Sequence, residues 1–257
     1  MSGALRIRVG DVDFFGQGLH DLVITPDGFK GWDDGVDMRI TDTPFPQAHG
    51  SMNFPGYQSA RTISVSGKAF ADSNADLRWL RNKLTGILAD GGLGRIQVDR
   101  DGDMTWAECR LASKTKFDEI GGTNTADFQV QFWCPDPRKF GSTRTFTASV
   151  GASASGVHHR GNYNATPRFV VAGSMPGGYT LTIKGQVFNV TKPLVSGQPH
   201  SIDYGDGRLR INGAIVHGGL GWGFTPLVTP GVATVLSIEP ITTGTATATL
   251  TLLDTYI

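Results

Sequence analysis

The 257-residue chain carries 23 basic and 23 acidic side chains, so its formal net charge is zero. Its composition, 39% hydrophobic and 18% charged, is too apolar for a disordered chain and too polar for a membrane protein. The 35 glycines, about twice the usual share, indicate a turn-rich protein, and most such proteins are all-β. Because nucleic-acid binders concentrate Lys and Arg, the balanced charge also argues against a protein that grips DNA.

Short strands and one long loop are predicted in the first 70 residues. Residues 4–9 alternate apolar and basic side chains, as a half-buried strand does, and shorter strand signals follow at 22–25 and around Trp32. Alternation returns at residues 61–68. In between, residues 43–57 are rich in Pro, Gly and Asn, and proline removes backbone donors. This stretch therefore predicts a long loop or an excursion at a sheet edge.

One helix is predicted at about residues 73–90. Ser73 and Asp76 have the spacing of a capping box, although Asp is a poorer partner than Glu at its last position. The residues that follow form one apolar stripe at three- and four-residue intervals: Leu77, Leu80, Leu84, Ile87 and Leu88. Gly91-Gly92 provides a left-handed stop. We expect this helix to cover the open side of a sheet.

A strand meander follows the helix. Residues 95–99 and 104–113 predict two strands joined by Arg100-Asp101-Gly102, a strong hairpin signal. Residues 114–120 and 126–133 continue the meander. The chain then reaches two prolines and an aromatic residue before a stretch of small residues, so we place a domain boundary after residue 141.

The second half predicts a small β-sandwich at 142–257. Residues 147–156 are small and weakly patterned, which is typical of a linker or an edge strand. After Pro167, strand signals recur every 8–12 residues. The expected strands are 169–172, 179–184, 186–191, 201–204, 208–212, 234–239 and 246–253. The last of them places threonines on one face and Ala or Leu on the other, which favours a sheet with one solvated side.

Local patterns that resemble chemical sites do not satisfy the requirements of those sites. Asp99, Asp101 and Asp103 suggest a calcium loop, but Arg110 stands where an EF-hand needs a bidentate Glu. The six histidines have no metal-ligand spacing, and the glycine clusters do not join a strand to a helix, as a phosphate loop does. Cys109 and Cys134 lie in expected strands and are interpreted as buried apolar residues. We therefore expect no enzyme, cofactor or metal.

The order of several turn and strand motifs is more specific than any one of them. In the first half they are Gly35–Arg39, His49-Gly50, Arg61–Gly67 and Phe132–Arg138. In the second half they are Gly161–Gly173, Asp203 before Gly205-Asp206-Gly207, and Phe224–Gly231. In this order and spacing the chain resembles the distal tail proteins of siphophages, the long-tailed bacteriophages. One departure is Val232-Ala233-Thr234 after Pro230-Gly231, where asparagine is common in that family.

The resemblance implies a structural protein with no catalytic residues. It implies a mainly all-β fold with a split β-barrel-like domain and one helix at 1–141, followed by a galectin-like β-sandwich at 142–257. Members of that family form a homohexameric ring at the distal tip of the virion tail, which joins the tail tube protein to the tail-associated hub protein. Receptor-binding or baseplate proteins attach at its periphery, and DNA only passes through the channel. The zero net charge agrees with a conduit that does not hold DNA.

Two sets of residues are candidates for contacts. The loop at 43–57 is expected to touch a neighbouring subunit or ring through Phe45, His49, Phe54 and Tyr57, since its aromatic side chains are otherwise exposed. The alternative function is a lectin-like module that stacks sugars on Tyr179 or Trp222. The histidines, arginine and asparagine needed for galectin-type recognition lie before a strand rather than along it, at residues 158–162. A galectin-like fold does not by itself carry sugar binding.

Overall fold

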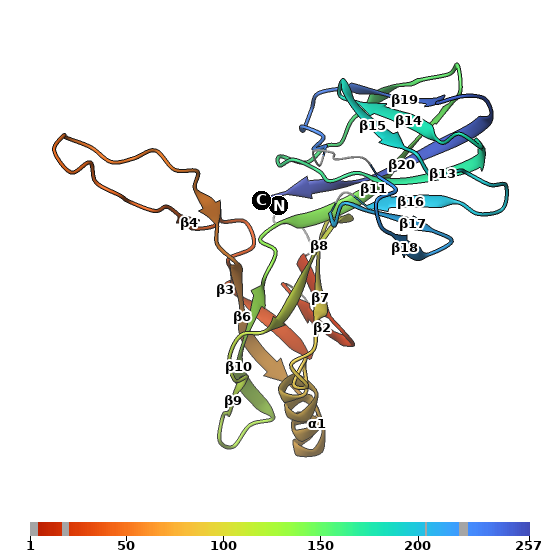
Figure 1. The fold of residues 1–257 in the computed structure, drawn as a ribbon. Helices are drawn as coiled ribbons and strands as arrows, with labels where there is room; N and C mark the ends of the chain where they lie inside the picture. Colours follow the sequence, from red (N-terminus) through yellow and green to blue (C-terminus); the bar gives the residue numbers. More distant parts are fainter. Residues whose placement is uncertain (1–4, 17–20, 204, 221–225) are drawn as a thin grey trace. The chain divides into compact units, whose positions relative to one another are not determined.

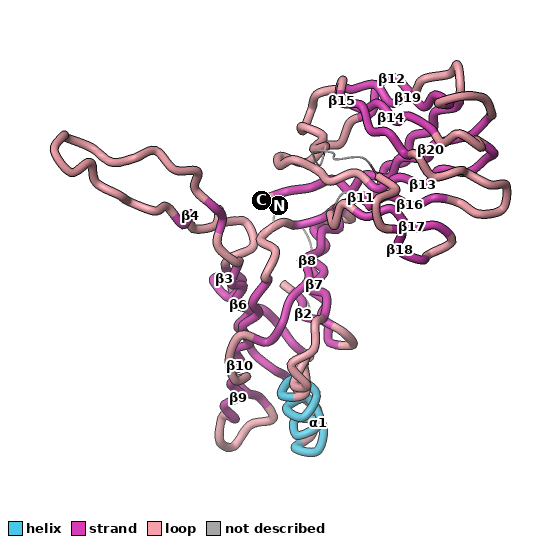
Figure 2. Tube along the Cα trace, in the orientation of Figure 1, coloured by secondary structure: helices cyan, strands magenta, loops and turns pink. Residues whose placement is uncertain are grey.

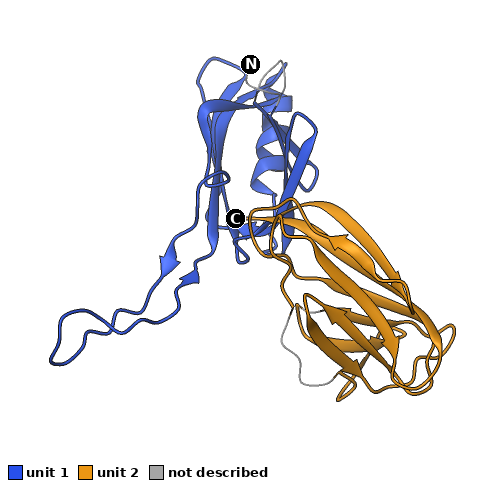
Figure 3. Ribbon diagram, turned by 90° about the horizontal axis from the view of Figure 1, so that it is seen from above, with its two compact units in different colours: residues 1–139, 257 blue, residues 140–256 orange. Residues whose placement is uncertain are grey.

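The structure is a computed structural model that describes residues 5–16, 21–203, 205–220 and 226–257 (Figure 1). The chain divides into two compact units, residues 1–139 with Ile257, and residues 140–256 (Figure 3). The division lies two residues before the boundary expected from the sequence. Strands dominate both units, and one helix occurs among the described residues, so the fold is all-β, as predicted (Figure 2).

Unit 1 is built from ten strands and a helix in its described part. The strands are β1 (Leu5–Val9), β2 (Val12–Phe15), β3 (Leu22–Lys30), β4 (Met38–Arg39), β5 (Tyr57–Gln58), β6 (Arg61–Phe70), β7 (Gly94–Arg100), β8 (Asp103–Leu111), β9 (Lys116–Glu119) and β10 (Thr125–Cys134). Seven of these described strands close a barrel in the order β7-β1-β2-β3-β6-β10-β8. Closure occurs where β8 pairs with both β7 and β10, and it leaves β9 as an extra strand beside β10.

The barrel core follows the period-two pattern of its strands. Ile63 and Val65 on β6 face inward opposite Phe132 and Val130 on β10, and all four side chains are fully buried. The predicted hairpin at residues 100–102 is confirmed between β7 and β8, where Asp101 and Gly102 both take positive φ angles. The three aspartates around it therefore belong to a turn, in which Asp99 Oδ1 accepts a hydrogen bond from the Gly102 amide at 2.8 Å.

Helix α1 (Asn74–Thr85) begins where the sequence predicts and ends earlier. Ser73 is its N-cap, and the Ser73 side chain accepts from the Asp76 amide at 3.2 Å. The helix buries Leu77, Leu80 and Leu84 in the barrel core. The prediction of a helix to residue 90 was wrong, because the helix ends at Gly86, whose amide bonds back to Asn82 O at 3.0 Å. Glycine is a poor helix former, and the next residues form turns that still bury Ile87.

Unit 2 is a sandwich of two antiparallel sheets around one hydrophobic core. Its described strands are β11 (Lys139–Ser149), β12 (Ala154–Val157), β13 (Arg168–Ser174), β14 (Tyr179–Ile183), β15 (Gln186–Val190), β16 (His200–Asp203), β17 (Arg208–Ile211), β18 (Ala214–Val216), β19 (Thr234–Pro240) and β20 (Thr245–Tyr256). One sheet has the order β18-β17-β16-β13-β20-β11 and the other β12-β19-β14-β15. β11 and β12 occupy most of the stretch from 147 to 156.

The last strand confirms the face assignment made from its alternation. Ala248, Leu250 and Leu252 on β20 are fully buried, whereas the threonines between them are partly exposed. The strand pairs with β13 over seven residues, from Arg168↔Thr251 to Ser174↔Thr245. Among the residues that the structure describes, no helix is long and apolar enough to span a membrane.

Candidate interaction surfaces

A long ribbon, which we call the arm (residues 33–60), leaves the barrel between β3 and β6. It projects away from the barrel in both views (Figures 1 and 3). Its two sides pair as β4 and β5 near the root, with Met38 opposite Gln58. Further out, the Met52 amide bonds to Thr43 O at 2.9 Å and the Phe45 amide to Gly50 O at 3.1 Å. The segment expected to be a loop at 43–57 is therefore the outer part of a longer ribbon.

The arm exposes six large apolar side chains, at 41% to 70% of their surface: Met38, Ile40, Phe45, Met52, Phe54 and Tyr57. Met38 and Ile40 lie side by side, since a side chain at Gly56 would meet both within 3.4 Å. The predicted contact residues Phe45, Phe54 and Tyr57 are thus exposed, as is His49 near the outer turn. The sequence prediction missed the three aliphatic members, although Met38 and Ile40 alternate with Arg39 as strand residues do.

An isolated two-stranded ribbon has no core of its own. Such ribbons are marginally stable in water, and third strands or a packing surface normally support them. Solvated apolar side chains gathered on one projecting element commonly mark a protein interaction site. The arm therefore has the properties of a segment that packs against another protein surface.

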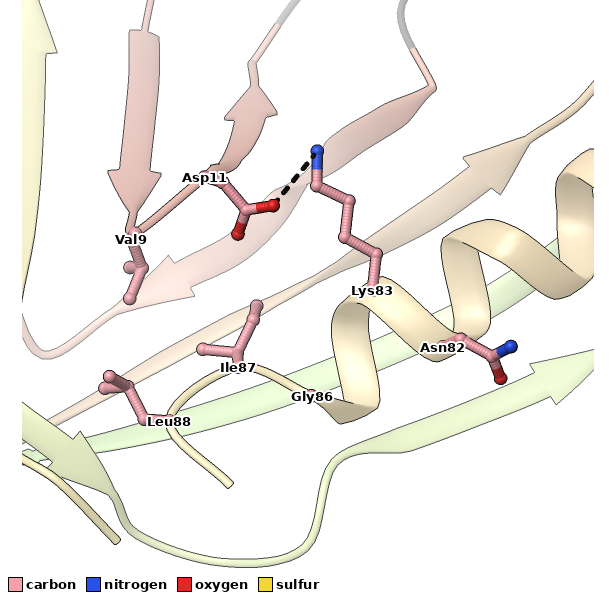
Figure 4. Close-up of a pocket in the computed structure, with 8 residues that line it drawn as sticks. Val9, Asp11, Asn82, Lys83, Gly86, Ile87 and Leu88 are labelled. Carbon is pink, nitrogen blue, oxygen red and sulfur yellow. Dashed lines mark ion pairs between the residues drawn. The ribbon is translucent and has the colours of Figure 1, made fainter. Parts of the chain in front are cut away.

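A groove lies between α1 and the β1–β2 hairpin, on either side of Lys83. One part, about 290 Å³, is lined by Val9, Gly10, Asp11, Asn82, Lys83, Gly86, Ile87 and Leu88 (Figure 4). The other part, about 250 Å³, is lined by Val12, Asp13, Phe15, Asp21, Leu22, Trp79, Leu80 and Lys83. The Lys83 ammonium lies 3.9 Å from Asp11 Oδ2 and 4.9 Å from the centre of the Trp79 ring. The lysine thus occupies the groove itself.

A third cavity, about 470 Å³, lies in unit 2 on the outer side of β14 and β19. Its lining is Thr182, Lys184, Gly185, Val228, Thr229, Val232, Ala233, Thr234, Val235 and Ser237. Lys184 Nζ donates to Thr229 Oγ1 at 2.9 Å. Hydroxyl side chains, valines, Gly185 and Ala233 make up the rest of the wall, and no aromatic side chain is among these lining residues.

The residues proposed for sugar contact do not form a site in the described chain. Tyr179 is fully buried, and its hydroxyl lies 3.2 Å from His200 Nδ1, so a sugar has no access to its ring and this prediction was wrong. Trp222 lies outside the described residues. His159 is also buried, where its Nε2 lies 3.0 Å from Val228 O and its Nδ1 accepts from the Gly161 amide.

Buried titratable groups elsewhere have structural surroundings. Cys109 and Cys134 are completely buried and unpaired, and burial raises the pKa of the Cys109 thiol to about 11 and that of Cys134 to about 12. Both thiols are therefore protonated at neutral pH, which agrees with their interpretation as apolar residues. No group of three or more His, Cys, Asp or Glu that could hold a metal occurs among the residues described.

Searches with protein-family models and against curated proteins give no match. Among solved structures, the chain is similar to the SPP1 Dit (gp 19.1) protein, described as a paradigm of the hub adsorption apparatus in phages that infect Gram-positive bacteria. The similarity covers 98% of this chain and 99% of SPP1 Dit, with a TM-score of 0.75 and 15% sequence identity. Chains of the phage P2 baseplate in its activated conformation match with 8% and 9% identity and TM-scores of 0.46 and 0.45, over 96% or more of each chain. The chain thus shares the fold of SPP1 Dit over both units.

Proposed function

We propose that this protein is a structural component of a siphophage virion, a distal tail protein at the tip of the tail. The observation that carries the proposal is the similarity to SPP1 Dit from end to end, through the barrel unit and the sandwich unit together. A barrel or a sandwich alone hosts many functions, whereas this succession of the two is a far more specific arrangement. The order of turn motifs along the sequence supports the same family independently of the coordinates.

In the proposed assembly, six copies close into a ring that joins the tail tube to the hub protein. Residues 1–139 build the ring, and residues 140–256 provide a galectin-like sandwich on which receptor-binding or baseplate proteins dock. DNA passes through the ring without being held, which suits a chain with 23 basic and 23 acidic residues. The role needs no catalytic residue, cofactor or metal.

The arm supplies the contact between copies in this proposal. Ring interfaces are heterologous, so one surface of each copy must fit a different surface of the next. The arm offers such a surface because it projects from the barrel (Figure 1) and its exposed apolar side chains have no core of their own. Seating them on the neighbouring copy would remove them from water and stabilise the ribbon at the same time.

Size-exclusion chromatography with light scattering tests this proposal. We expect the wild-type protein to show six times the 27.5 kDa mass of the chain. The double variant Ile40→Ser, Tyr57→Ser should fall to the monomer mass, because it removes the two most exposed apolar side chains of the arm, at 70% and 66%. Val187→Ser is the matched control, since Val187 is 59% exposed on β15 and belongs to the other unit.

Two outcomes would contradict the proposal. If the wild-type protein is strictly monomeric at high concentration, the proposed ring is contradicted and the lectin-like alternative is favoured. A glycan array then tests that alternative. Equal hydrogen exchange of residues 43–57 in the monomer and in the assembled protein would exclude the arm from the contact.

A further inference from the structure

Two buried cations lie at the root of the arm. Arg61 is the first residue of β6, where the returning side of the arm enters the barrel. Lys139 ends the 1–139 segment of unit 1 and is also the first residue of β11, whose other residues belong to unit 2. Their side chains belong to residues that are only 2% and 8% exposed. Burial lowers the pKa of both groups, because each cation has lost water. Charged side chains are seldom buried this deeply without a specific set of partners.

The Arg61 guanidinium replaces that water with backbone carbonyls from two separate segments. Its Nη1 donates to Gly31 O at 2.6 Å and Asp34 O at 2.9 Å, and lies 3.1 Å from Trp32 O. These carbonyls belong to residues 31–34, where the chain leaves the barrel and enters the arm, a segment that we call the arm root. Its Nε donates to Pro137 O at 3.0 Å, in the segment that leads out of unit 1.

Lys139, at the end of the exit segment, binds the same part of the arm root as Arg61. Its Nζ donates to Trp32 O at 2.7 Å, so this carbonyl is shared by both cations. The ammonium also lies 5.7 Å from the centre of the Trp32 ring, which is buried and stacked on Phe29 at 6.3 Å. One backbone carbonyl, that of Trp32, is therefore bound by Arg61 of the returning strand and by Lys139 of the exit segment.

The arm root has little freedom to adjust. Gly31 has a φ of +84°, and a Cβ there would lie 2.0 Å from Thr62 O, so the root packs directly on the backbone of β6. Arg61 Nη2 is buried and has no hydrogen-bond partner within the described residues. The buried guanidinium therefore already lacks one acceptor, and the loss of another would add to that cost. If either segment moved alone, it would leave a buried cation facing fewer acceptors, which is costly in a low-dielectric interior.

We propose that Arg61 and Lys139 couple the arm root to the exit segment 135–139, so that the two segments move together or not at all. A tightly packed junction of this kind changes between discrete arrangements rather than deforming gradually. Any displacement of the arm root is then passed to the chain segment that leads into residues 140–256. If the arm seats on a second copy, a point that rests on the proposed function, the junction carries that event along the chain.

Hydrogen exchange measured by mass spectrometry on the monomeric full chain tests the coupling. The variants are Arg61→Lys, which keeps the charge but cannot span carbonyls of both segments, and Lys139→Met, which removes one bond to Trp32 O. In each variant we expect exchange to accelerate in residues 29–37 and 135–139 together, by roughly 10- to 100-fold for the loss of a hydrogen bond to a charged group. Ile96→Ala is the control, since it opens a cavity in the barrel core on β7, where Ile96 is fully buried and pairs with Val9 and Ala107 rather than with either segment of the junction.

The pattern of exchange separates the proposal from a general loss of stability. The control should accelerate exchange across the barrel strands without singling out the two segments. If Arg61→Lys accelerates hydrogen exchange in only one of the segments 29–37 and 135–139, or in neither, the proposed coupling is overturned whatever the oligomeric state. When the protein assembles, the wild type should also slow exchange in 135–139, and Arg61→Lys should slow it only in the arm. A failure of assembly itself would count against the proposed function and leave the monomer result as the test of the junction.

Discussion

Asp254 near the end of β20 is predicted to be the strongest polar anchor of the sandwich unit. Its carboxylate accepts from Arg144 Nε at 2.6 Å, from Arg144 Nη2 at 3.0 Å and from the Arg160 amide at 2.7 Å. The Asp254 side chain is 4% exposed and that of Arg144 is 21% exposed. Asp254→Asn keeps the shape of the side chain but removes the charge, and it leaves Arg144 without its ionic partner.

The expected cost follows from this burial. Breaking a buried ion pair on one side typically costs 3–5 kcal/mol, and because Arg144 can turn partly to water we expect about 3 kcal/mol. For a unit of this size that corresponds to a decrease of about 12 °C in midpoint. Differential scanning calorimetry should show the decrease in the transition of unit 2 and not in that of unit 1. Asp206→Asn is the control, because it makes the same chemical change in an exposed ion pair with Arg210 and should leave both transitions in place.

The stability that Asp254 contributes to unit 2 should depend on pH in a defined direction. Burial alone would raise the pKa of Asp254, but the hydrogen bonds from Arg144 and the Arg160 amide, with the charge of Arg144, hold that pKa below its usual value. The ion pair therefore contributes fully above the pKa of an unfolded aspartate, about 3.9, and its contribution is lost as the pH falls through the lower, folded pKa. The stability gap between wild type and Asp254→Asn should close in that acid range. A gap under 1 kcal/mol at pH 7, or one that persists at low pH, would refute the reasoning.

Three further predictions concern the stability of the two units and the accessibility of the buried thiols. Gly31→Ala should destabilise unit 1 by roughly 2–4 kcal/mol in calorimetry, because its Cβ would collide with Thr62 O and φ is positive, and an unchanged midpoint would contradict this. Burial lowers the pKa of His200, so unit 2 should lose stability as the pH falls below about 6.5, and His200→Gln should remove that component of the pH profile. Cys109 and Cys134 should not react with a thiol reagent at pH 7 until the barrel unfolds, and rapid labelling of the native protein would show that the core opens.

Elements with strong local signals could be predicted from the sequence. The alternation of β20, the Asp101-Gly102 hairpin and the Ser73 cap all have local causes in side-chain period or turn chemistry, and all three are present in the structure. The end of α1 was misjudged because Gly91-Gly92 is a stronger stop signal than Gly86, although the chain already leaves the helix at Gly86. The stretch from 147 to 156 was ambiguous because Ala, Ser, Thr and Gly show little difference between the two faces of a strand.

Long-range features had weaker signals in the sequence. The parallel contact of β2 with β3, at Phe15↔Val23, depends on barrel closure and not on any local pattern. The outer part of the arm, residues 43–57, had no periodicity, because prolines and glycines interrupt it, so only its aromatic residues pointed to a contact. The burial of Arg61 does have one signal in the sequence. It stands two residues before Ile63 on the inward face of β6, so a charged residue occupies a core position of an otherwise regular strand.

Immunogold electron microscopy of virions tests the central claim most directly. Antibodies against residues 140–256 should label the distal tip of the tail, and a virion containing the Ile40→Ser, Tyr57→Ser variant should fail to assemble this tip. Label along the whole tail, on the head, or absent from intact virions would contradict the assignment of this protein to the tail tip.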